Sequence, residues 1–204
     1  MSRLGALQEP KFRLLWLGQT ASSLGDSLIY VALPFAVIQV GGGAAELGLV
    51  FASFTLARAG FIVVGGVWAD RLPRRMVMLT CDAIRAAVQG VTAVGLLTGW
   101  MEIWMFVVTS AIFGAGQAFF SPASTGLVPE TISAARLQQA NALLKLSESS
   151  TNILGPSVAG LLVALWEPGW VFALDSLSFV VSAFFLVQLR LRPREPSPRQ
   201  RFIA

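Results

Sequence analysis

Residues 47–68 read LGLVFASFTLARAGFIVVGGVW, an apolar stretch that carries a single charged residue, Arg58. A helix needs about 20 mostly apolar residues to cross a lipid bilayer, and this stretch has that length. Stretches of similar character lie at about residues 14–40, 76–97, 103–127, 137–165 and 170–189. The sequence therefore predicts an all-α integral membrane protein, with six transmembrane helices forming one bundle over residues 1–190.

The composition agrees with this class and excludes several others. Apolar types make up 55% of the 204 residues and charged types only 13%, and the mean hydropathy is +0.69. Soluble domains carry about 25% charged residues. The chain has no histidine and a single cysteine, Cys81, so histidine metal sites, Ser-His-Asp triads and an intrachain disulfide are excluded. We expect no enzyme, no metal or cofactor, and no nucleic-acid partner.

Basic residues lie at alternate ends of the apolar stretches, which sets the orientation. The intervening connections hold no Lys or Arg and carry Glu46, Glu102 and Glu167 instead. Since cytoplasmic loops are enriched in Lys and Arg, we expect both termini to be cytoplasmic, in a bacterial inner (plasma) membrane. Residues 191–204 are predicted to form a basic, proline-rich cytoplasmic linker that stops short. The basic residues at this end are Arg3, Lys11, Arg13, Arg71, Arg74, Arg75, Arg136, Arg190, Arg192, Arg194, Arg199 and Arg201.

Ionisable residues inside the predicted spans point to a function, because each costs about 2.5–3.5 kcal/mol at mid-helix. Asp26 lies near the middle of its span and can change protonation there, whereas Asp82 and Arg85, at i,i+3 spacing, predict a structural ion pair. Polar residues repeat at helical spacing on three spans, as a water-lined path would require. The full set of ionisable residues is Asp26, Arg58, Asp82, Arg85, Lys145, Glu148 and Asp175, the last expected nearer the acidic end.

The segment that follows residue 64 reads GGVWADRLPRR and lies at the basic end of the second span. It resembles the signature loop between the second and third helices of the major facilitator superfamily, the pattern G-x-x-x-D-R-x-x-R-R/K. The resemblance implies a gating latch formed by Gly66, which would allow close helix approach, and by the charged residues that follow it. Those charged residues are Asp70, Arg71, Arg74 and Arg75.

A second segment, GPSVAG at residues 155–160, resembles the family's antiporter motif G-P-x-x-G-G, with Ala159 in place of one glycine. The resemblance implies a bend at Gly155, Pro156 and Gly160, and Pro156 also removes a helical hydrogen bond. Residues 139–142 and 174–179 resemble the multidrug, macrolide and siderophore efflux branch. The fourth span lacks the basic residue of many drug–proton antiporters, and spans one to three show no clear repeat in spans four to six.

The resemblance implies one half of a major-facilitator fold, because members of the family have twelve spans built as two halves. We expect a secondary transporter half that exports amphipathic small molecules in exchange for protons across the lipid bilayer. Its second half would be another copy or a separate C-terminal half. The alternative is a non-transporting membrane scaffold or regulatory subunit, whose intramembrane charges are structural pairs. Residues expected in proton coupling or the substrate path are Asp26, Tyr30, Arg58, Gln117, Glu148 and Asn152.

Overall fold

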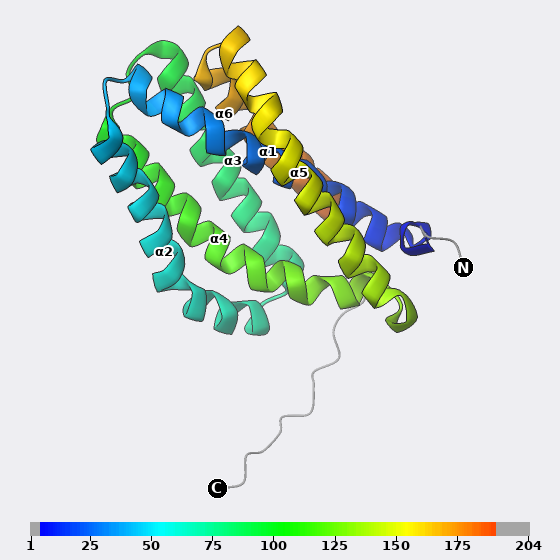
Figure 1. Ribbon diagram of the computed structural model, residues 1–204. Coiled ribbons are helices and arrows are strands. Elements are labelled where there is room, and N and C mark those ends of the chain that lie inside the picture. Colours follow the sequence, from blue (N-terminus) through cyan, green and yellow to red (C-terminus); the bar gives the residue numbers. More distant parts are fainter. Residues whose placement is uncertain (1–4, 191–204) are drawn as a thin grey trace, which may run out of the picture.

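A computed structural model describes residues 5–190, apart from the side chains of Ala69 and Asp70. Within this range the chain forms six long α-helices and two short 3-10 helices (Figure 1). The long helices are α1 (Pro10–Gln39), α2 (Ala44–Arg71), α3 (Arg74–Thr98), α4 (Ile103–Thr131), α5 (Leu137–Leu165) and α6 (Pro168–Gln188). The predicted linker at residues 191–204 lies outside the described residues.

Five of these helices, α1, α2, α3, α4 and α6, are long and apolar enough to cross a membrane. The exception, α5, has 29 residues and therefore the necessary length, but no membrane-length stretch of it is apolar enough. Its polar residues include Lys145, Glu148 and Asn152, which line one groove of the bundle. The predicted fifth span is thus amphipathic, with one polar side.

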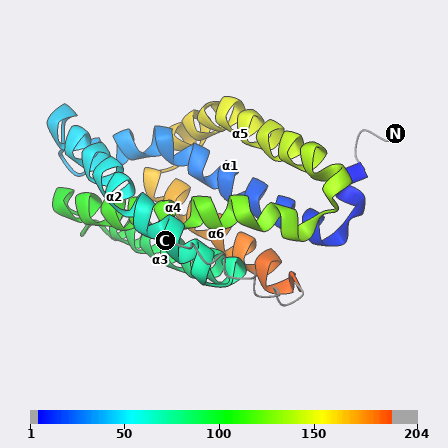
Figure 2. The ribbon, with the colours of Figure 1, turned by 90° about the horizontal axis from the view of Figure 1, so that it is seen from below.

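The packing of the helices has an internal symmetry. The extensive contacts join α1 to α5 and α6, α4 to α2 and α3, and α3 to α6. Exchanging α1–α3 with α4–α6 converts this set of pairs into itself. Figure 2 shows α5 along one edge of the bundle and α3 along the other, with α1 and α4 between them. The two three-helix units are therefore equivalent in packing, although no repeat is evident in their sequences.

The core has an apolar cluster toward each end and a polar layer between them. Phe12, Met78 and Leu127 belong to the cluster near the basic end. Val37 and Phe106 belong to the cluster near the opposite end. The polar layer consists of buried side chains on α1, α3 and α6, namely Ser22, Ser27, Asp82, Arg85, Gln89, Thr92, Asp175 and Ser182.

Arginines at the basic end connect the ends of separate helices. The Arg75 guanidinium donates hydrogen bonds to the main-chain oxygens of Leu186 (2.7 Å) and Val187 (2.6 Å) in the last turn of α6. The Leu186 carbonyl also accepts a hydrogen bond from the Leu189 main-chain N–H at 3.1 Å, and a cation at this end interacts favourably with the helix dipole. Arg74 contacts the Gly126 carbonyl and forms an ion pair with Glu130 of α4 at 3.1 Å.

The signature segment differs from its expected form in two respects. It is largely helical, because α2 continues to Arg71 and α3 begins at Arg74. In addition, the close approach lies at Gly65, where a Cβ atom would sit 2.5 Å from the Ala118 carbonyl oxygen of α4, whereas nothing lies near Gly66. Successive helical residues point about 100° apart, so only one of two adjacent glycines can face α4.

This difference gives a matched pair of substitutions. Gly65→Ala places a methyl group against the α4 backbone, and we expect it to lower the stability of the bundle by about 1–3 kcal/mol. Gly66→Ala meets open space and should be neutral or stabilising by about 0.5–1 kcal/mol, since alanine favours the helix. Thermal unfolding of both variants in lipid nanodiscs measures the difference. Equal stability of the two variants would contradict the α2–α4 contact.

Candidate functional site

The polar layer is organised around Arg85 on α3, whose side chain is only 1% exposed. Its guanidinium donates to Asp82 Oδ1 at 2.6 Å and to Gln117 Oε1 of α4 at 2.9 Å. It also lies over the rings of Phe120 and Phe179, at 4.1 and 4.4 Å from their centroids. Cation–π contacts of this kind strengthen when the cation is desolvated. One side chain therefore connects α3, α4 and α6.

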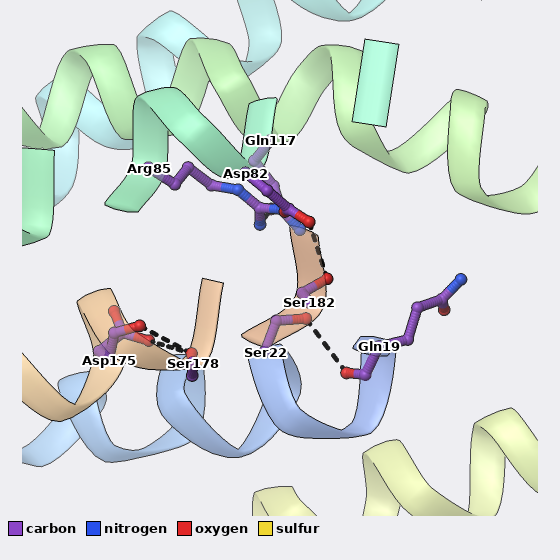
Figure 3. Close-up of polar contacts among 8 residues, drawn as sticks. All are labelled: Gln19, Ser22, Asp82, Arg85, Gln117, Asp175, Ser178 and Ser182. Atoms are coloured by element: carbon purple, nitrogen blue, oxygen red, sulfur yellow. Dashed lines mark hydrogen bonds and ion pairs between the residues drawn. The ribbon is translucent and has the colours of Figure 1, made fainter. Parts of the chain in front are cut away.

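The Asp82 carboxylate accepts hydrogen bonds from side chains of two helices. While its Oδ1 binds Arg85, its Oδ2 accepts a hydrogen bond from the Ser182 hydroxyl of α6 at 2.7 Å (Figure 3). The carboxylate is fully buried, and such a group is tolerated when it is both paired and hydrogen-bonded. The spacing of Asp82 and Arg85 along α3 thus corresponds to a direct ion pair.

A second buried carboxyl group belongs to Asp175 of α6, which contacts Gln89 of α3. The Gln89 amide Nε2 is 2.5 Å from Asp175 Oδ2, and the Ser178 hydroxyl is 3.3 Å from Oδ1. Gly25 of α1 packs directly against Asp175 and Ser178. Asp175, expected nearer the acidic end of the bundle, lies beside Gly25 and belongs to the polar layer.

Asp26 lies at the junction of two cavities, both of which it lines. Its Oδ1 atom is buried and has no hydrogen-bond partner among the described residues. Electrostatic interactions connect it to Arg85 and Asp82. An unpaired carboxyl group in this position is able to bind a proton or a cationic group that enters either cavity.

The first cavity is aromatic, with a volume of about 340 Å³. It lies between α1, α2 and α4, and small parts of α3 and α6 complete it. Arg58 of α2 lines it, is exposed, and forms no ion pair within the described part of the chain. The ring-bearing residues of its wall are Tyr30, Phe51, Phe54, Phe106, Phe113 and Phe172.

The second cavity is a polar groove of about 440 Å³ between α1, α4 and α5. Lys145 and Glu148 form an exposed ion pair at 2.9 Å on its α5 side. The polar atoms Gln19 Nε2 and Thr20 Oγ1 are buried there without a hydrogen-bond partner among the described residues. Buried polar groups normally have a protein or water partner, so this groove is suited to water. Asn152, expected in the substrate path, also lines it.

Comparison with known proteins identifies the family. The profile of the Major Facilitator Superfamily matches residues 15–204. The chain belongs to this superfamily. Among curated relatives, macrolide efflux protein A of Streptococcus pyogenes is 27% identical over 89% of this chain and 45% of its own length. The enterobactin exporter EntS of Shigella boydii is 26% identical over 94% of this chain and 46% of its own length.

The uncharacterized MFS-type transporter YfiS of Bacillus subtilis is 28% identical over 97% of this chain and 49% of its own length. The chain thus spans about half the length of the curated relatives it matches. Together with the apolar helices, these matches show a multi-pass protein of the bacterial inner membrane. The resemblance to the efflux branch of the superfamily is therefore confirmed.

The residues of the two superfamily motifs are distributed unevenly in the structure. Gly155 of α5 packs directly against Ser27 of α1, next to Asp26, whereas nothing lies within contact of Gly160. Pro156 lies inside α5. Arg74 and Arg75 bind the ends of α4 and α6 as described above, and Arg71 is exposed. The Asp70 side chain lies outside the described residues.

Sequence reasoning missed the role of Gln89 and of the α6 hydroxyls. A signal was available, because Asp82, Arg85 and Gln89 follow steps of three and four, as do Asp175, Ser178 and Ser182. Each set occupies one helix face. What the sequence does not show is that the two faces meet, since Gln89 and Asp175 are 86 residues apart.

The Arg85–Asp82 pair gives a test by double-mutant cycle. Arg85→Met leaves Asp82 as an uncompensated buried charge, and we expect a loss of about 3–5 kcal/mol of unfolding free energy. The double variant Asp82→Asn/Arg85→Met removes both charges and should be more stable than Arg85→Met alone. Chemical unfolding in detergent micelles measures the cycle. Additive effects of the two substitutions would contradict direct pairing.

Proposed function

We propose that this chain is one six-helix half of a secondary transporter that exports amphipathic small molecules in exchange for protons. The observation that carries the proposal is the position of Asp26, which lies between an aromatic cavity and a polar groove with an unpartnered carboxyl oxygen. Ionisable residues inside membrane helices commonly belong to ion or substrate pathways. The relatives' names, macrolide efflux protein and enterobactin exporter, support export.

The cavity walls support an amphipathic substrate. The aromatic rings bury apolar surface and stack with substrate rings, while Asp26 and Arg58 supply opposite charges in the same cavity. Arg58 favours the ionised form of Asp26 when the two approach. Tyr30 and Gln117 line both cavities together with Asp26, so they lie where a substrate and a proton would compete.

A second half is required in this proposal. The chain covers 45–49% of the length of the relatives compared above. A second six-helix half would cover both cavities and complete the pathway. Alternating access would then arise from movement of one half against the other.

The ends of the bundle support an orientation and a gate. Arg74, Arg75 and Arg136 gather at one end and make contacts there with α4, α6 and the start of the chain. By the enrichment of Lys and Arg in cytoplasmic loops, this end faces the cytoplasm. We propose that these contacts, with Asp70 and Arg71, stabilise the state closed on that side, and that the bend at Gly155 and Pro156 allows α5 to move on α1.

The second candidate is a non-transporting scaffold or regulatory subunit. The ion pairs Asp82–Arg85 and Lys145–Glu148 favour it to the extent that these charges balance one another inside the bundle. It leaves Asp26 without a role. A scaffold would show no stabilisation by any transported compound and no effect of Asp26 on flux.

The experiment is a fluorescent-dye efflux assay driven by an imposed pH gradient in bacterial cells that express the chain, where two copies would supply both halves. Efflux by the wild type above that of empty-vector cells is the reference. Asp26→Asn keeps the size of the side chain but cannot exchange a proton, so we expect pH-driven efflux to be lost while the protein amount in the membrane is unchanged. Glu167→Gln, an exposed change at the end of the bundle, is the matched control. Undiminished efflux in Asp26→Asn would remove Asp26 from the mechanism.

A further inference from the structure

Asp175 is the buried acid that the proposed pathway leaves unexplained. Its side chain is 0% exposed, and none of the described Lys or Arg side chains forms an ion pair with it. Its carboxyl group has two side-chain contacts, Gln89 at 2.5 Å and Ser178 at 3.3 Å. The Ser178 hydroxyl also lies 2.7 Å from the main-chain oxygen of Asp175, to which it donates. A carboxylate with so few donors is costly in a dry interior.

The charges on the neighbouring helices do not relieve this cost. From α3, Asp82 and Arg85 face the layer and pair with each other at 2.6 Å, and Cys81 lies buried on the same helix. From α1, Asp26 repels an ionised Asp175 more strongly than Arg85 of α3 attracts it. Three carboxyl groups therefore share a single guanidinium that is already bound to one of them. On α5, the ionisable residues Lys145 and Glu148 pair with each other.

We propose that Asp175 holds a proton in the folded bundle and exchanges it with the aromatic cavity through Gln89. Gln89 is the connecting residue because its amide contacts Asp175 and also lines that cavity. An amide can present either its carbonyl or its NH₂ group to a carboxyl group. In the structure Gln89 Nε2 donates to Asp175 Oδ2, a bond that the carbonyl oxygen of the protonated acid accepts as well as the ionised acid does. When the Gln89 amide turns, water of the aromatic cavity takes up or returns the proton at the carboxyl group.

The proton on Asp175 has a mechanical consequence for α1. Gly25 packs so closely on Asp175 and Ser178 that a Cβ atom at this position would overlap both side chains. A neutral carboxyl group is compatible with this dry contact. Once Asp175 releases its proton to the cavity, the carboxylate repels Asp26 and requires water, which separates α1 from α6. The role of this movement in transport rests on the proposed function, whereas the proton on Asp175 does not.

The test is infrared spectroscopy of the purified chain in lipid nanodiscs at about pH 7, where an ordinary aspartate is fully ionised. A protonated carboxyl group gives a C=O stretching band, separate from those of ionised carboxylates. We expect such a band in Asp26→Asn, where Asp26 cannot contribute one, and its loss in the double variant Asp26→Asn/Asp175→Asn. Asp82→Asn is the matched control and should retain the band, because the Asp82 carboxylate is ionised against Arg85.

A second variant keeps the proposal testable if Asp175→Asn does not fold. Gln89→Leu retains the acid but removes its hydrogen-bond partner, so the band should remain and shift in frequency. An Asp26→Asn spectrum without the band, a band that persists in Asp26→Asn/Asp175→Asn, or a band that does not shift when Gln89→Leu is added to Asp26→Asn would each overturn the proposal. Since the band is read without transport, these results are independent of the efflux assay on Asp26→Asn.

Discussion

The ion pair between Arg85 and Asp82 is the interaction on which the interior of this bundle depends. In a membrane, packing of apolar side chains does not by itself distinguish a neighbouring helix from lipid. A buried guanidinium does distinguish a helix from lipid, because its N–H donors need acceptors, and only specific helices provide them. Arg85 reaches Asp82 on its own helix and Gln117 on α4, and it lies over Phe179 of α6. Its position therefore specifies how three helices meet.

The same need for hydrogen-bond partners explains the positions of the polar side chains in the bundle. Side chains that have partners are enclosed between two apolar clusters, as Asp82 and Ser182 are. Asp26, whose Oδ1 has no partner among the described residues, lies instead where two cavities meet. The amphipathic character of α5 follows from this arrangement, because one of its sides lines the polar groove. The Asp82–Arg85 pair is thus enclosed, whereas Asp26 is open to both cavities.

Much of the architecture could be predicted from the sequence, because hydropathy and the distribution of Lys and Arg are properties of short segments. The superfamily was also evident from two local motifs. The contacts between helices were not evident from the sequence, because they depend on which side of each helix faces which neighbour. The choice of Gly65 over Gly66 depends on the rotation of α2, and the position of Asp175 depends on how α6 lies against α1 and α3. Neither the Gly65 contact nor the position of Asp175 can be deduced from the spacing of residues along one helix.

In the proposed mechanism, Asp26 exchanges a proton against a substrate that occupies the aromatic cavity. The most direct measurement is proton release from the purified protein in weakly buffered nanodiscs when an aromatic cation such as ethidium is added. We predict that ethidium binding releases protons from the wild type and that Asp26→Asn binds ethidium without releasing protons. Ethidium binding with no proton release from the wild type, or equal release from Asp26→Asn, would contradict it.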